Sequence, residues 1–201
     1  MTTVPSPVTD ALIARKYGAE TLEQKTHNKV ALQESLGWPA EPKRAMICIP
    51  TGISDALGGA LLKEILPGLM ELPISLVILG KGSSSYGALL TQMAKEQSHK
   101  IAIISNDEKS VHTMFAAADM ALFLTDAAEL PELPIALRYG TIPIAPANKI
   151  LKNYDPNQEN GDAFTFEKRN AWHCFAAVVR ALETYRFPFD WKTIQRQGME
   201  K

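Results

Sequence analysis

The loop at residues 51–60, TGISDALGGA, has a composition that suits phosphate binding. It follows a short apolar run at 45–49 and precedes the helical pattern LLKEILPGLMEL. Glycines between a strand and a helix N-terminus let backbone N–H groups hold a phosphate, so Gly52 and Gly58 are candidate nucleotide contacts. Their spacing matches neither the dinucleotide fingerprint nor the P-loop. A tight turn between strand and helix would use the same glycines without any ligand.

Polar residues in three other loops could contribute to the same nucleotide site. Lys81 lies in the loop GKGSSSYG, where a lysine can either reach a phosphate or remain solvated. Asn106 follows the third apolar run, and Glu129 lies close to Glu132 after the fourth. Because ligands of parallel sheets bind at the carboxyl ends of the strands, we take Lys81, Asn106 and Glu129 as further candidate contacts.

The histidines and cysteines give no sign of a metal site. No two histidines have metal-ligand spacing to each other or to a carboxylate or cysteine, and each suits a surface or packing position better than that of a base. We therefore assign no catalytic residue, no metal and no cofactor. The histidines concerned are His27, His99, His112 and His173.

The central stretch, residues 119–145, reads as a strand, a loop, a helix that stops at Gly140, and a second strand. Similar alternation along the chain predicts an α/β fold with a doubly wound, Rossmann-like parallel sheet. We divide the chain into a helical entry segment, 1–44, and a domain, 45–201, that ends in helices. Strands are expected at 45–49, 74–79, 101–104, 120–124, 142–144 and 163–166, and helices at 11–17, 20–36, 61–72, 86–96, 108–117, 130–137, 170–184 and around Trp191.

Composition excludes several classes of function. Lys and Arg total 21 against 22 Asp and Glu, so bulk charge favours neither a nucleic acid nor a membrane surface as partner. No apolar run approaches the roughly 20 residues of a membrane helix, and MTTVPSPVTD lacks the features of a secretory signal. Cys48 and Cys174 lie in apolar contexts far apart, which predicts free thiols in a cytoplasmic protein.

Three segments resemble one enzyme family. ALRYGTIPI, the pattern NDE…H…AAADMALFLT and the tail RALETYRFPFDWKTIQRQGM are similar to bacterial glycogen synthases and plant starch synthases. These are retaining, ADP-glucose-dependent glycosyltransferases of the GT-B type. The resemblance covers nearly the whole chain but only the C-terminal half of such an enzyme. Met1 then falls near an inter-domain junction, so the chain is either an excised half or an isolated half-enzyme.

The chain departs from the family where the resemblance places catalysis. The family's active-site Glu falls on Ala127, and a Gln six residues later falls on Leu133. An Arg and a Lys that hold the sugar-nucleotide diphosphate fall on Gly52 and Leu57. The glycines of a Thr-Gly-Gly-Leu turn are replaced in the segment 148–151, NKIL. The resemblance thus implies a retained scaffold with altered site residues.

Three functions remain open at this point. The chain could be a degenerate synthase-like domain that acts as a non-catalytic module, with residual binding of ADP-glucose or glucan, or docking on a partner. It could instead be the nucleotide-sugar half of an active glucosyltransferase, with Glu129 or Glu132 replacing the missing Glu and Lys81 replacing a lost cation. Alternatively, it could be a nucleotide-binding Rossmann-like domain unrelated to glucan metabolism, because fold does not fix function.

Apolar residues in the loops at the strand ends suggest a protein interface. An isolated half-enzyme would leave this loop face open, and apolar side chains there would suit a second copy of the chain or a separate partner. The same side chains could instead fold inward and fill an empty pocket. The loop residues concerned are Ile53, Leu57, Tyr86, Leu130, Leu133 and Ile150, while Trp172, Phe175, Val178, Val179 and Leu182 are expected to form a core stripe on one helix.

Overall fold

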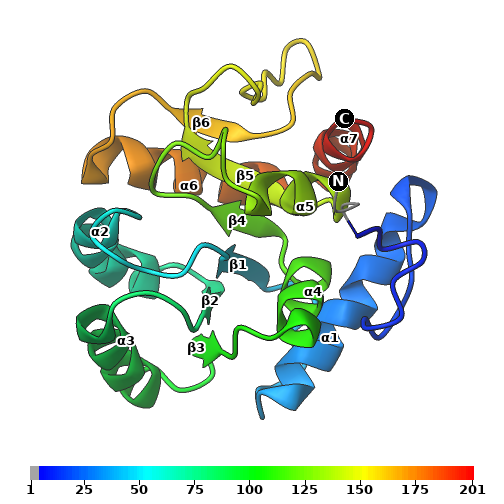
Figure 1. The fold of residues 1–201 in the computed structure, drawn as a ribbon. Coiled ribbons are helices and arrows are strands. Elements are labelled where there is room, and N and C mark those ends of the chain that lie inside the picture. The colour runs from blue at the N-terminus through cyan, green and yellow to red at the C-terminus, as the bar shows by residue number, and fades with distance from the viewer. Residues whose placement is uncertain (1–4) are drawn as a thin grey trace.

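The computed structural model describes residues 5–201 and is built around a six-stranded, all-parallel sheet with helices on both faces (Figure 1). The strand order is β3-β2-β1-β4-β5-β6. This order confirms the predicted doubly wound, Rossmann-like class. The strands are β1 (Ala45–Ile49), β2 (Ile74–Leu79), β3 (Ile101–Ile104), β4 (Met120–Leu122), β5 (Ile142–Pro146) and β6 (Phe164–Phe166).

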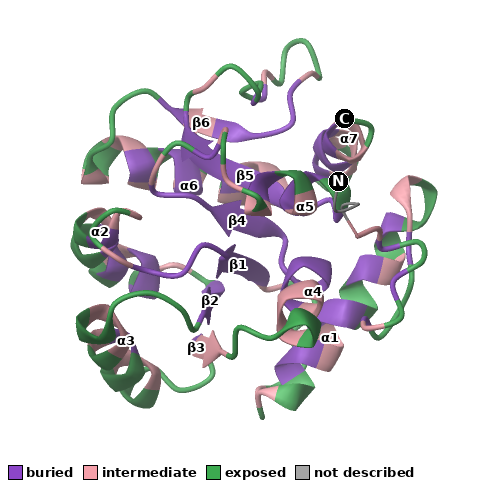
Figure 2. Cartoon of the chain, viewed as in Figure 1, coloured by how far each residue is buried: buried purple, intermediate pink, exposed green. Residues whose placement is uncertain are grey.

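The strands form because short apolar runs are buried on both sides of the sheet (Figure 2). In β1, Ala45, Ile47 and Ile49 pack into one core, while Met46 and Cys48 pack into the other. This alternation is the two-residue period of a strand covered on both faces.

Helices from different parts of the chain cover the two faces. One core includes buried residues of α2 (Gly59–Glu71), α3 (Ser84–Glu96), α6 (Ala171–Tyr185) and α7 (Pro188–Met199). The other includes residues of α1 (Lys25–Ser35), α4 (Glu108–Ala117) and α5 (Glu132–Arg138), together with the 3₁₀ helix η1 (Ala19–Gln24). No helix among residues 5–201 is long and apolar enough to cross a membrane.

The helix expected at 11–17 is absent, and that prediction was wrong. The backbone bends there because side chains take the groups that a helix would use. The Asp10 carboxylate accepts the Leu12 N–H, and the Asn28 side chain accepts from the N–H of Arg15 and donates to its C=O. The proposed boundary between 44 and 45 remains a proposal, and residues 1–4 of that segment lie outside the described residues.

The expected core stripe on α6 was wrong at Trp172, which is 80% exposed. The helix instead buries Cys174, Ala177, Val178 and Ala181, a face with helical spacing. Trp172 lies two residues before Cys174, which places it on the opposite side. Of the other predicted members, Val178 lies at the centre of this face. Phe175, Val179 and Leu182 are half-buried beside it.

Candidate functional site

The strand order creates a crevice between the carboxyl ends of β1 and β4. The connections from these neighbouring strands run to opposite sides, and ligands of doubly wound folds bind at such a switch point. A cavity of about 540 Å³ opens there, lined by the β1–α2 loop, the residues after β4 and the residues before α6. Its charged side chains are Asp55, Glu64 and Arg169, so carboxylates outnumber cations in the crevice.

Backbone geometry explains both glycines that the sequence singled out. Gly52 has φ +71°, and a Cβ there would lie 2.3 Å from the Lys81 carbonyl oxygen. Gly58 has φ +86°, and a Cβ there would lie 2.5 Å from the Leu124 Cβ. Ile53 bonds to the loop after β2, accepting from Ser83 N–H at 2.8 Å. The turn and the close approach of loops therefore require these glycines, and phosphate binding by them stays a prediction.

Tyr86 and Asp55 cover the N-terminus of α2. A Cβ on Gly59, the first residue of α2, would lie 2.4 Å from the Tyr86 ring. The Tyr86 hydroxyl donates to Asp55 Oδ1 at 2.6 Å, and this hydrogen bond raises the pKa of Tyr86. An anion approaching the first turn of α2 would meet an aromatic ring and a carboxylate, which oppose it.

Lys81 is engaged by Glu132, and the structure brings these two predicted residues together. Lys81 Nζ lies 2.7 Å from Glu132 Oε1, in the first turn of α5. The Glu132 side chain is 13% exposed and that of Lys81 is 36% exposed. A diphosphate that used Lys81 would have to displace this carboxylate.

The positions that match the family's Glu and Gln face the core. Ala127 has no exposed surface and Leu133 is 2% exposed, and both belong to the same core cluster as Ala136. Side chains at these positions therefore fill the interior. This agrees with the alternative that apolar loop residues fold inward. Ile53 is likewise buried, whereas Ile150 remains 44% exposed.

Other candidates lie apart from the crevice or lack partners. Asn106 is exposed after β3, which is the edge strand, separated from β4 by β2 and β1. Glu129 is exposed, and the described residues give its side chain no hydrogen bond or ion pair. In the segment that replaces the family's glycine turn, Asn148 Oδ1 accepts from the N–H groups of Ile150 and Leu151. No cluster of metal-ligating side chains occurs within residues 5–201.

The sequence reading missed Asp55 and Arg169 as crevice residues, and it placed Tyr86 on the loop face only as an apolar residue. Asp55 was visible as a carboxylate within the glycine-containing loop. Tyr86 and Arg169 come from segments far along the chain, and only the folded topology places them near the start of α2.

Comparisons with known proteins identify relatives in sequence and in fold. The glycogen synthase of Bacillus anthracis is 33% identical over 205 residues, and glycogen synthase 1 of Synechocystis is 32% identical over 207. The catalytic domain of starch synthase IV from Arabidopsis thaliana, bound to ADP and acarbose, has a TM-score of 0.82 at 25% identity over 98% of this chain. This chain is a homologue of the C-terminal domain of glycogen and starch synthases. No family model matches the sequence.

This chain spans less than half the length of the relatives that it matches. It aligns over 98% of its own length with each of the two glycogen synthases but spans only 43% of theirs, and 43% of the starch synthase chain. The C-terminal domain of a group 1 glycosyl transferase from Francisella tularensis, LpcC, matches over 95% of its length with a TM-score of 0.63. At 14% identity this second likeness concerns the fold alone, which is that of a GT-B C-terminal domain.

Proposed function

We propose that this synthase homologue is a catalytically degenerate, nucleotide-sugar-side domain that acts as a non-catalytic interaction module. The observation that carries the proposal is that the groups around the switch-point crevice that could bind an anion already contact other groups of the protein. Tyr86 and Asp55 cover the α2 N-terminus, and Glu132 holds Lys81. A sugar-nucleotide diphosphate leaving group needs fixed cations or N–H groups at this place.

The replaced residues support the same conclusion. Gly52 and Leu57 stand where the family resemblance expects an Arg and a Lys, and Ala127 stands where it expects the active-site Glu. Gly52 cannot be exchanged for a larger residue without moving the loop after β2, because its Cβ position is already filled by Lys81 backbone. The scaffold therefore resists return of the missing Arg side chain.

A transfer assay tests the proposal. We expect no transfer of glucose from ADP-glucose or UDP-glucose to glycogen by the chain alone. A GT-B site also needs a first domain, so the assay is repeated with the N-terminal half of an active glycogen synthase added in excess. The same half mixed with the C-terminal half of that active enzyme is the positive control. Turnover by the homologue in the mixture would contradict the proposal.

A further inference from the structure

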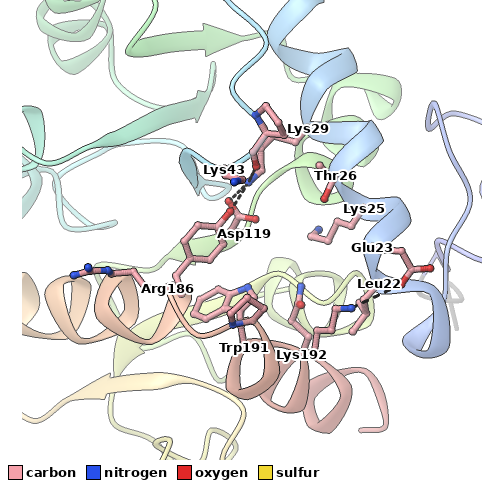
Figure 3. A pocket seen from close by; sticks show the side chains of 14 residues that line it. Leu22, Glu23, Lys25, Thr26, Lys29, Lys43, Asp119, Arg186, Trp191 and Lys192 are labelled. Atoms are coloured by element: carbon pink, nitrogen blue, oxygen red, sulfur yellow. Dashed lines mark hydrogen bonds and ion pairs between the residues drawn. The ribbon is translucent and has the colours of Figure 1, made fainter.

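A cavity of about 640 Å³ lies at the amino ends of the strands, on the opposite side of the sheet's strand ends from the crevice (Figure 3). Asp119 directly precedes β4 and Lys43 lies just before β1, and both line it. The remaining walls come from α1 and from the corner between α6 and α7. A volume of this size falls within the range of small-molecule sites.

Positive charge dominates the lining. Lys29 is paired with Asp119 at 2.6 Å, and Lys192 stands 3.9 Å from Glu23. Lys43 is exposed, and the described residues offer it neither an ion pair nor a hydrogen bond. The cations of the lining are Lys25, Lys29, Lys43, Arg186 and Lys192, and its carboxylates are Glu23 and Asp119.

Lys25 is a buried cation without a contacting counterion. Its ammonium donates to the carbonyls of Phe115, Ala116 and Tyr139 and to the hydroxyls of Thr141 and Tyr17, all of which are neutral. Burial lowers the pKa of Lys25 to about 7, with Lys29 acting in the same direction and Asp119 and Cys48 opposing it. An anion in the cavity would stabilise this ammonium.

Trp191 contributes an unused donor. Its side chain lies at the foot of the cavity, below Asp119 (Figure 3), and the residue is 4% exposed. The indole N–H is buried, and none of the described residues accepts from it. An unmet buried donor is destabilising, so a ligand acceptor that reached this N–H after a small turn of the ring toward the cavity would be favourable.

We propose that this cavity binds a small phosphate monoester. Lys43 and Lys192 hold the phosphate at the mouth, and the Trp191 N–H donates to an acceptor oxygen. A phosphate monoester suits several donors at once, because it offers close to two negative charges and three acceptor oxygens. The organic part of the ligand lies against apolar surface from Leu22, Pro42 and Pro188, which a free inorganic ion would leave uncovered.

Nuclear magnetic resonance of the indole N–H groups tests this site with phenyl phosphate as the probe. The Trp191→Phe variant identifies the Trp191 resonance, and Trp172, which is 80% exposed, serves as an internal reference. We expect a saturable shift of the Trp191 resonance with a Kd of about 1 mM or below, and no comparable shift at Trp172. No saturable shift of any indole resonance in the native chain would overturn the proposal, and this result needs no variant to fold.

Charge variants and a second probe sharpen the test. Exchanging both mouth lysines, Lys43→Gln with Lys192→Gln, should weaken phenyl phosphate binding by about tenfold or more. The matched control exchanges two exposed lysines elsewhere, Lys63→Gln with Lys95→Gln, and should leave binding unchanged. An equal loss in both pairs would mean non-specific attraction, and inorganic phosphate binding as tightly as phenyl phosphate would mean a site for the bare ion. Either result contradicts the proposal.

Discussion

Two ion pairs of similar length lie at opposite ends of the strands and differ in burial and in role. Lys29 and Asp119 meet at 2.6 Å where the strands begin, with side chains 3% and 9% exposed. Lys81 and Glu132 meet at 2.7 Å among the loops at the strand ends, with side chains 36% and 13% exposed. The first pair is enclosed by protein, and the second lies among the loops at the carboxyl ends of the strands, where doubly wound folds bind ligands.

The difference shows which of the two pairs connects elements of the fold. Asp119 also accepts the Met46 N–H at 2.8 Å, so the enclosed pair joins α1 to the starts of β1 and β4. The loop-edge pair joins the loop after β2 to the first turn of α5 and engages the Lys81 ammonium. The enclosed pair thus connects elements of the fold, whereas the charged groups at the loop edge bind one another.

The largest effect is expected from breaking the enclosed pair. Lys29→Met should lower the free energy of unfolding by about 3–5 kcal/mol, because it leaves Asp119 buried without its cation. Urea unfolding measures the change. The double variant Lys29→Met with Asp119→Asn should recover part of the loss. A loss below about 1 kcal/mol in the single variant would mean that the pair behaves like a surface one.

A smaller effect is expected from Lys25, as a dependence of stability on pH. In the unfolded chain Lys25 has its ordinary pKa of 10.5, whereas in the folded chain the pKa is about 7. Between these values the unfolded state binds the extra proton, so stability should rise with pH, by at most about 1.4 kcal/mol per pH unit. The usable window ends below pH 9, because the Cys48 and Cys174 thiols of the unfolded chain are half ionised at their ordinary pKa of 9.0.

Substitution checks the assignment of that slope. Lys25→Met should flatten the rise in unfolding free energy above neutral pH, while Lys63→Met, at an exposed position on α2, should keep it. If the slope persists in Lys25→Met, another titrating group must cause the rise of unfolding free energy with pH.

The loop-edge pair should matter little for folding. Glu132→Gln or Lys81→Gln should each change the free energy of unfolding by less than about 1 kcal/mol, because the lysine is partly exposed and solvent screens the charges. Chemical denaturation of both variants measures this. A loss of several kcal/mol in either would show that the pair supports the fold rather than occupying the crevice.

The smallest effect on folding is expected at Ile150, which is 44% exposed. Ile150→Asp should change stability by no more than about 0.5 kcal/mol. If the loop face is an interface, light scattering across a concentration series should show self-association of the native chain that is weakened by Ile150→Asp and by Leu57→Asp. A strictly monomeric chain whose two variants both lose several kcal/mol would instead make these residues core.

The sequence predicted elements whose signals are local. The bounds of β1, β2, β3 and α4 were predicted as observed, because each is a short apolar or periodic run with clear stop residues. The segment 11–17 failed because its competing hydrogen bonds come from Asp10 and from Asn28, which lies beyond the segment. Trp172 failed because aromatic composition does not say which side of a helix faces the sheet.

The candidate site was harder to predict than the fold. Lys81 and Glu132 were each visible as loop-edge charges, but their contact joins residues 51 positions apart and depends on how the loops pack. The covering of α2 by Tyr86 likewise follows from loop packing. The unused Trp191 N–H follows from the packing of α7 against Phe164 of β6 and Tyr185 of α6, which no local pattern encodes.

Titration calorimetry with ADP-glucose tests the central claim most directly. We expect the native chain to bind ADP-glucose no more tightly than about 1 mM, because cations that would each contribute roughly 1.5–3 kcal/mol are absent or engaged. Glu132→Gln, which frees Lys81, should strengthen any residual binding, whereas Glu129→Gln, at an exposed position without a partner among the described residues, should not. Micromolar affinity of the native chain for ADP-glucose would contradict the account.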